Sequence, residues 1–228
     1  MIMIFHQIQR LILSSKILPF SSMKKYYHCY KCDFKKETSS YDYTLFCGNC
    51  STLLDLPKNV NYFKLLGLEK DAFYLDEKSL SNAYKSLQRN LHPDKYVLKS
   101  DEEKEFAGRW SSTVNEAYQV LKNPAKRSQY LLELVSMPLL EGEVKIESDF
   151  LADMMELNEE LEEISSSKDL ESFDYENDRK LNKLFADFSY AMESENLEEA
   201  RSLTAKIKYF INIKDKIKDL EEKFGIIK

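Results

Sequence analysis

Two amphipathic segments separated by a proline constrain the fold of this chain more than any other feature. Pro93 disfavours helical geometry at the preceding residue and lacks a backbone donor, so the first helix is predicted to end at or near Leu91. A second helix is predicted to begin at a cap formed by Ser100 or Asp101. The apolar face of the first helix is Leu80, Ala83, Tyr84, Leu87 and Leu91. That of the second is Phe106, Trp110, Val114, Ala117 and Leu121.

Capping residues and a second proline set the ends of the remaining helices in this hairpin. Asn61 is predicted to cap a short helix that Gly67 ends, and Asp76 is predicted to cap the first long helix. Asn123 and Pro124 stop the second long helix and start a short closing one. The unit is therefore expected to be a short helix, two long antiparallel helices and a short helix that packs back on them.

The composition favours an all-α protein. Only 5 Gly and 5 Pro in 228 residues leave little room for a turn-rich β fold. Three more helices are predicted at roughly residues 149–165, 169–195 and 197–223, and their short connections indicate a three-helix bundle. The segment before them contains Pro138 and Gly142 and is typical of a linker. A net charge of -6 argues against a general affinity for nucleic acid.

The four cysteines form two short motifs, C-x2-C-x14-C-x2-C, at Cys29, Cys32, Cys47 and Cys50. This spacing lets four thiolates converge on one tetrahedral ion, with zinc favoured over two disulfides or a redox pair. Spacing leaves iron open. Four protein ligands leave no position for a substrate, so a structural role is expected. Gly48 and Asn49 are expected to supply left-handed turn geometry, and His28 to sit exposed beside the site.

The N-terminus has a composition of its own. The first acidic residue is Asp33, and residues 1–22 combine apolar residues with Ser, Arg10 and Lys16. Such a basic, acid-free start is typical of a mitochondrial transit peptide, with a disordered extension as the alternative. No segment is long and apolar enough to predict a membrane span.

The stretches "YFKLLGL", "YKSLQRNLHPDKY" and "VNEAYQVLKNPAKRSQYLL" resemble a J-domain. J-domains stimulate ATP hydrolysis by a DnaK-class chaperone, so the resemblance implies that His92, Pro93 and Asp94 contact that chaperone, helped by Lys85 and Arg89. A rigid turn beside a positive stripe suits an acidic partner. The chain shows no nucleophile beside His92 and no phosphate-binding loop. It is therefore not expected to be an enzyme.

The segment "FLADMMELNEELEEI" carries more apolar residues than one docking face needs. The face that docks on the bundle is predicted to be Phe150, Met154, Leu157, Leu161 and Ile164. Leu151 and Met155 are left over beside an acidic row. Periodicity alone is equally compatible with a partner-binding patch and with an ordinary solvated face.

This segment is similar to the HscB family, in which a J-domain is joined to a three-helix bundle that binds an IscU-type iron-sulfur cluster scaffold protein. The resemblance implies that the scaffold-binding residues are Leu151, Met155, Glu156, Glu159, Glu163 and Phe210. Ala152 stands where the family usually has Met. The tetracysteine segment is similar to that of eukaryotic forms.

The resulting organisation is a transit peptide at 1–22, a zinc-binding module at 23–57, a J-domain at 58–134, a linker at 135–148 and a scaffold-binding bundle at 149–228. The resemblance implies a co-chaperone that delivers the scaffold to a DnaK-class chaperone in the mitochondrial matrix, with a cytosolic pool left open. A J-protein for another client and a zinc-ribbon protein that binds nucleic acid are the alternatives. Partners are expected to include neither nucleic acid nor membrane.

Overall fold

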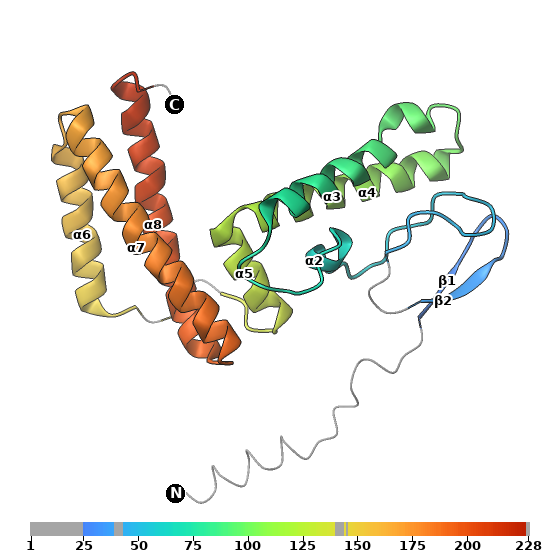
Figure 1. The fold of residues 1–228 in the computed structure, drawn as a ribbon, viewed down its shortest axis with the longest axis horizontal. Helices are drawn as coiled ribbons and strands as arrows, with labels where there is room; N and C mark the ends of the chain where they lie inside the picture. The colour runs from blue at the N-terminus through green and yellow to red at the C-terminus, as the bar shows by residue number, and fades with distance from the viewer. Residues whose placement is uncertain (1–24, 39–42, 140–143, 145, 227–228) are drawn as a thin grey trace, which may run out of the picture.

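The computed structural model describes residues 25–38, 43–139, 144 and 146–226, and helices dominate it (Figure 1). The J-type unit consists of α2 (Tyr62–Leu65), α3 (Glu77–Asn90), the 3-10 turn η2 (Pro93–Tyr96), α4 (Asp101–Lys122) and α5 (Pro124–Leu134). The C-terminal bundle consists of α6 (Ser148–Glu163), α7 (Ser167–Glu193) and α8 (Leu197–Lys223). The all-α prediction is confirmed. The expected transit peptide lies outside the described residues.

Local side-chain caps set the helix boundaries of the hairpin. The Asn61 side chain accepts from the Lys64 amide, and the Ser100 hydroxyl accepts from the Glu103 amide at 3.3 Å. Helix α3 ends at Asn90, as the following proline predicted. Gly67 follows α2 with a φ of 69°, the left-handed conformation that suits glycine after a helix.

Helices α3 and α4 pack against each other around a fully buried row on α4, formed by Trp110, Val114, Ala117 and Leu121. Leu80 and Leu91 at the two ends of α3 are buried, whereas the three apolar residues between them are half-buried. The reason is that α3 is an outer helix covered mainly by α4, so its apolar face is only partly enclosed. Tyr84 and Tyr118 stack across this seam with ring centroids 4.1 Å apart.

In the bundle, α7 and α8 run antiparallel along most of their length, and α6 lies on the outside (Figure 1). Met154 and Leu161 of α6 are buried, and the other three residues of its predicted docking face are half-buried. Phe150 meets Tyr209 and Phe210 of α8 edge-on. The predicted docking face of α6 is therefore confirmed, with less enclosure than a central helix would have.

An aromatic joint ties the J-type unit to the bundle. Phe73, in the segment between α2 and α3, is buried and lies 5.3 Å from the Phe185 ring and 5.2 Å from the Phe188 ring of α7. The buried guanidinium of Arg127 covers the Phe73 ring at 5.1 Å. Helix α5 also packs against α8. One apolar core thus continues from the hairpin into the bundle.

The cysteine segment forms a small unit with an antiparallel ladder. Strand β1 (Lys25–His28) pairs with β2 (Lys35–Thr38), with His28 opposite Lys35. Sequence patterning did not predict these strands, because each is only four residues long and neither KYYH nor KKET alternates apolar with polar side chains. Among the described residues, no helix is long and apolar enough to cross a membrane.

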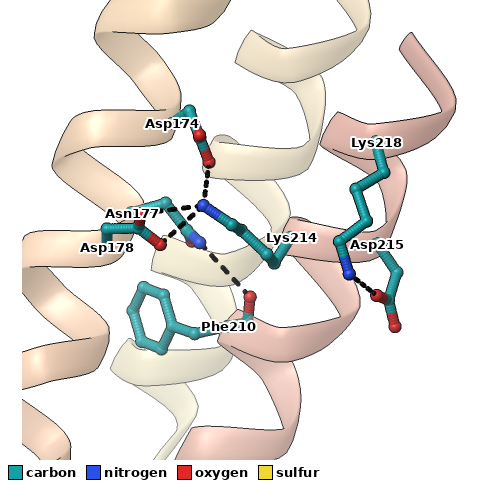
Figure 2. A network of polar contacts seen from close by, with 7 residues as sticks. All are labelled: Asp174, Asn177, Asp178, Phe210, Lys214, Asp215 and Lys218. Atoms are coloured by element: carbon teal, nitrogen blue, oxygen red, sulfur yellow. Dashed lines mark hydrogen bonds and ion pairs between the residues drawn. The ribbon is translucent and has the colours of Figure 1, made fainter. Parts of the chain in front are cut away.

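A polar network joins α7 to α8 in the bundle (Figure 2). The ammonium of Lys214 lies 2.6 Å from Asp174 Oδ1 and 2.7 Å from Asp178 Oδ1. Burial disfavours the charged amine, but the two carboxylates outweigh it and raise the pKa of Lys214. Asn177 Nδ2 donates to the Phe210 carbonyl at 3.4 Å. These contacts hold the register of the two long helices.

We expect Lys214→Ala to destabilise the bundle by about 1–2 kcal/mol, because it leaves two neighbouring carboxylates without their cation. The matched control is Lys218→Ala one turn further along α8, where the exposed pair with Asp215 should contribute less than about 0.5 kcal/mol. Urea unfolding at neutral pH measures both. Because the folded pKa of Lys214 is raised, its contribution persists at neutral pH and is lost only as the pH rises through that value. Equal effects of the two substitutions would contradict the assignment.

Candidate functional site

The four cysteine sulfurs converge in the folded chain. Their Sγ atoms all lie within 4.8 Å of one another. The separation is 3.6 Å for Cys29 and Cys50 and 3.7 Å for Cys32 and Cys47. A tetrahedron with metal-sulfur bonds of about 2.3 Å has edges of about 3.8 Å, whereas a disulfide bond measures about 2.05 Å. The cysteines are free thiols whose arrangement fits a four-coordinate metal ion.

The two knuckles share one backbone pattern. In the first, the Cys29 amide donates to the Phe34 carbonyl and the Asp33 amide donates to the Cys29 carbonyl. In the second, the Cys47 amide donates to the Thr52 carbonyl and the Ser51 amide donates to the Cys47 carbonyl. Each knuckle thus folds its two thiols toward the same side.

The left-handed residues of the knuckles are not those predicted. Asp33 and Ser51 have φ values of 57° and 55°, and each directly follows the second cysteine of its knuckle. The expectation that Gly48 and Asn49 would supply this geometry is wrong. The chain reverses after each cysteine pair rather than within it, so the left-handed residue is the one that follows the second cysteine.

Burial and hydrogen bonds shift the pKa values of the cysteine thiols in different directions. Burial raises the pKa of Cys29 to about 11. The Asn49 side chain donates to Cys32 Sγ at 3.5 Å and is the main cause that lowers the pKa of Cys32 to about 6. The Asn49 amide donates to Cys47 Sγ at 3.4 Å. His28 is exposed, as predicted, and its Nε2 lies 2.9 Å from Asp33 Oδ1, which directs it away from the thiols.

The His-Pro-Asp turn lies at the far end of the α3–α4 hairpin. Pro93 opens η2, and the exposed side chains of His92 and Asp94 flank it. The Asp94 amide donates to His92 Nδ1 at 3.3 Å, which leaves Nε2 of the ring for a partner. Tyr96 is buried, and its hydroxyl donates to the Asn90 carbonyl at 3.1 Å. The turn is therefore anchored by the buried Tyr96, while the polar side chains of His92 and Asp94 face solvent.

A basic stripe on α3 leads to this turn. Lys78, Lys85 and Arg89 are all exposed on that helix. Their positive charges create a field that attracts an acidic surface to the same end of the hairpin. Lys85 and Arg89 are thus on the helix that leads into the His-Pro-Asp turn, and chaperone contact by these two residues and by the turn stays a prediction.

A second exposed patch lies on α6. Leu151 is 36% exposed and Met155 is 66% exposed. The acidic side chains of Glu156, Glu159 and Glu163 are exposed on the same helix, as is Ala152. Most large apolar residues of a bundle are enclosed, so this apolar pair flanked by carboxylates resembles the centre and rim of a small protein interface.

Phe210, the sixth predicted scaffold-binding residue, has a different environment. Its side chain is only 6% exposed and packs in the bundle core beside Phe150. The neighbouring Tyr209 is 37% exposed and contacts the edge of the same Phe150 ring. The exposed aromatic surface beside α6 therefore belongs to Tyr209, which periodicity missed because the residue sits at the margin of the α8 core face. Direct contact by Phe210 stays a prediction.

Comparison with known proteins agrees with this architecture. Residues 61–130 match the DnaJ domain model, and residues 146–218 match the model described as the HSCB C-terminal oligomerisation domain. The iron-sulfur cluster co-chaperone protein HscB of Mus musculus is 34% identical over 83% of this chain and 81% of its own length. The co-chaperone protein HscB of Proteus mirabilis is 31% identical over 72% of this chain and 97% of its own length.

Solved structures show the same similarity. The crystal structure of human co-chaperone protein HscB superposes with a TM-score of 0.80 at 31% identity, covering 86% of this chain and 98% of that one. Chaperone HscB from Vibrio cholerae gives a TM-score of 0.66 at 29% identity, and the match covers 72% of this chain and 99% of that one.

The exposed His-Pro-Asp turn between two antiparallel helices, together with the DnaJ match, defines a J-domain protein. The C-terminal bundle and the extent of similarity to the mouse protein narrow this class, and the chain belongs to the HscB family of iron-sulfur cluster co-chaperones. These relatives are co-chaperones rather than enzymes.

Proposed function

We propose that this protein binds an IscU-type cluster scaffold through α6 and delivers it to a DnaK-class chaperone, whose ATPase it stimulates through the His-Pro-Asp turn. The observation that carries the proposal is the position of the two surfaces. The turn lies at one end of the molecule and α6 lies at the other (Figure 1). Both partners can therefore be bound at once, without competing for space.

The chaperone-binding surface would act by presentation rather than by chemistry. His92 and Asp94 offer one ring nitrogen and one carboxylate from a turn fixed by Pro93. The basic stripe would steer an acidic chaperone surface onto the turn. ATP would be bound and hydrolysed by the chaperone, and the J-domain would favour the chaperone conformation that hydrolyses it.

The scaffold-binding surface would combine a small apolar centre with an acidic rim. Leu151 and Met155 would bury against an apolar spot on the scaffold, and the three glutamates would pair with basic residues around it. Fixing the scaffold beside the chaperone raises its effective concentration there, so that two modest affinities produce one efficient encounter.

The remaining proposals concern the metal and the location. We infer that Cys29, Cys32, Cys47 and Cys50 hold one zinc ion, because four thiolates in a closed tetrahedral arrangement form a typical structural zinc site. The ion would stabilise the knuckles and would take no part in a reaction. The acid-free N-terminal composition supports import into the mitochondrial matrix, and a cytosolic pool stays open.

Replacing His92 with Gln should abolish stimulation of the chaperone ATPase, because the amide does not reproduce the imidazole contact at the turn. Scaffold binding should be unchanged. The matched control is Lys183→Gln, an exposed substitution on α7 that should leave stimulation intact. Steady-state ATPase assays with a DnaK-class chaperone measure the effect. Full stimulation by the His92 variant would refute the role of the turn.

The double substitution Leu151→Ser and Met155→Ser should weaken scaffold binding about tenfold or more, since it removes the apolar centre of the patch. Both residues are exposed, so the bundle should keep its stability. Leu98→Ser, which removes a 98% exposed leucine from the α3–α4 loop, is the control and should have no effect. Isothermal titration with an IscU-type scaffold gives the affinities, and equal affinity of all three proteins would make the α6 patch an ordinary surface.

Metal analysis of the purified chain should find one zinc per molecule, and Cys32→Ser should lose it, because three thiolates bind the ion much more weakly. Substituting the exposed Lys36 of β2 with Gln should leave the metal content at one and serves as the control. Iron in place of zinc, or a metal-free module with disulfide bonds, would overturn the assignment.

A further inference from the structure

The segment that leaves the second knuckle is joined to α4 by a buried hydrogen bond. Trp110 is fully buried, and its indole N–H donates to the Leu54 carbonyl at 2.8 Å. Leu54 follows Cys50 by only four residues and packs with Cys29 and Cys47 in the small core of the module. A buried indole needs an acceptor, so α4 depends on the module for this partner.

The residue before Leu54 makes a second connection. The Leu53 amide donates to Glu103 Oε1 at 3.5 Å, and Glu103 is buried although it carries a carboxylate. The Leu53 side chain is fully buried in the main core, while Leu54 belongs to the core around the thiols. Two consecutive residues therefore insert into two different cores. A shift of the knuckle would move both.

The first knuckle also contacts α4. Tyr30, between its two cysteines, meets the Phe106 ring edge-on at 5.4 Å. The guanidinium of Arg109 lies 5.0 Å from the same ring and pairs with Asp55 at 2.8 Å. Both knuckles thus rest on the first half of α4, and the metal ion would lock the two knuckles to each other.

This half of α4 supports the His-Pro-Asp turn. Glu103 is in the first turn of α4, and its backbone amide donates to the Ser100 hydroxyl that caps the helix. Burial and the charge of Glu103 both raise the pKa of Tyr96, the buried residue that ends η2. The turn η2 packs on α4. The module lies at the same end of the hairpin as this loop, away from the bundle (Figure 1).

We propose that the cysteine module is a brace for the chaperone-contacting loop: Trp110 and Glu103 act as positioning residues that transmit the metal-bound state of the knuckles to residues 92–104. Three buried residues are too small a core to hold the knuckles without a metal. When the knuckles open, the Leu54 carbonyl separates from Trp110 and the Leu53 amide separates from Glu103. The start of α4 then loosens. The consequence for chaperone stimulation rests on the proposed function.

Trp110 is the only tryptophan in the chain, so its fluorescence reports this junction directly. Full-length protein would be compared with its zinc loaded, removed by a chelator and then restored. We expect metal removal to shift the Trp110 emission to longer wavelength and to speed amide exchange of residues 92–104 by about tenfold or more, with α7 and α8 unaffected. Restoring zinc should reverse both changes.

Two outcomes would overturn the brace. One is unchanged emission and exchange after the metal has left; the other is an equal loss of protection in α7 and α8, which would make the module a general stabiliser. Trp110→Phe removes the hydrogen bond to the Leu54 carbonyl without removing a metal ligand. The variant should therefore keep one zinc per chain while amide exchange of residues 92–104 becomes faster. Tyr190→Phe, an exposed substitution on α7, is the control and should change neither the zinc content nor the amide exchange of residues 92–104.

A chaperone ATPase assay then tests the consequence. Metal removal should lower stimulation several-fold and leave scaffold affinity unchanged. If the zinc-loaded protein itself gives no stimulation, the proposed function fails. The fluorescence and exchange results still decide whether the module braces the loop, because neither measurement involves the chaperone.

Discussion

The aromatic joint around Phe73 determines how this protein can work. Phe73 belongs to the J-type unit, yet its ring is enclosed by Phe185 and Phe188 of the bundle and covered by Arg127. Burial of three aromatic rings and a guanidinium is worth several kcal/mol, far more than the polar contacts of a mobile domain interface. The hairpin and the bundle are therefore held as one body rather than as two domains on a linker.

This joint gives the two exposed surfaces a fixed relationship. The His-Pro-Asp turn lies at the end of the hairpin that points away from the bundle, and α6 lies on the outer side of the bundle (Figure 1). The cysteine module adds a second fixed contact at the loop end of the hairpin, where Trp110 and Glu103 hydrogen-bond to the backbone of residues 54 and 53. The hairpin is thus held at both ends, and the polar side chains of its braced loop stay exposed to meet a partner.

Local chemistry explains why much of the fold was predictable. Asn61, Ser100 and Pro93 act on the backbone within a few residues of themselves, so their helix boundaries follow from the chain alone. The cysteine spacing likewise predicted the convergence of four thiols. The β1–β2 ladder and the left-handed Asp33 and Ser51 were not predicted, because both arise from how the two knuckles close on each other.

The sequence by itself determined the helices, their caps, the thiol cluster and the leftover pair Leu151 and Met155, since each depends on periodicity or short spacing. Only the tertiary structure decided which residues at the margins of those helices are exposed. It enclosed Phe210 and left Tyr209 at the surface, and it brought Phe73 to α7 and Leu54 to Trp110. These pairs are separated by 56 residues or more along the chain, and no local pattern encodes which apolar side chain will fill which distant space.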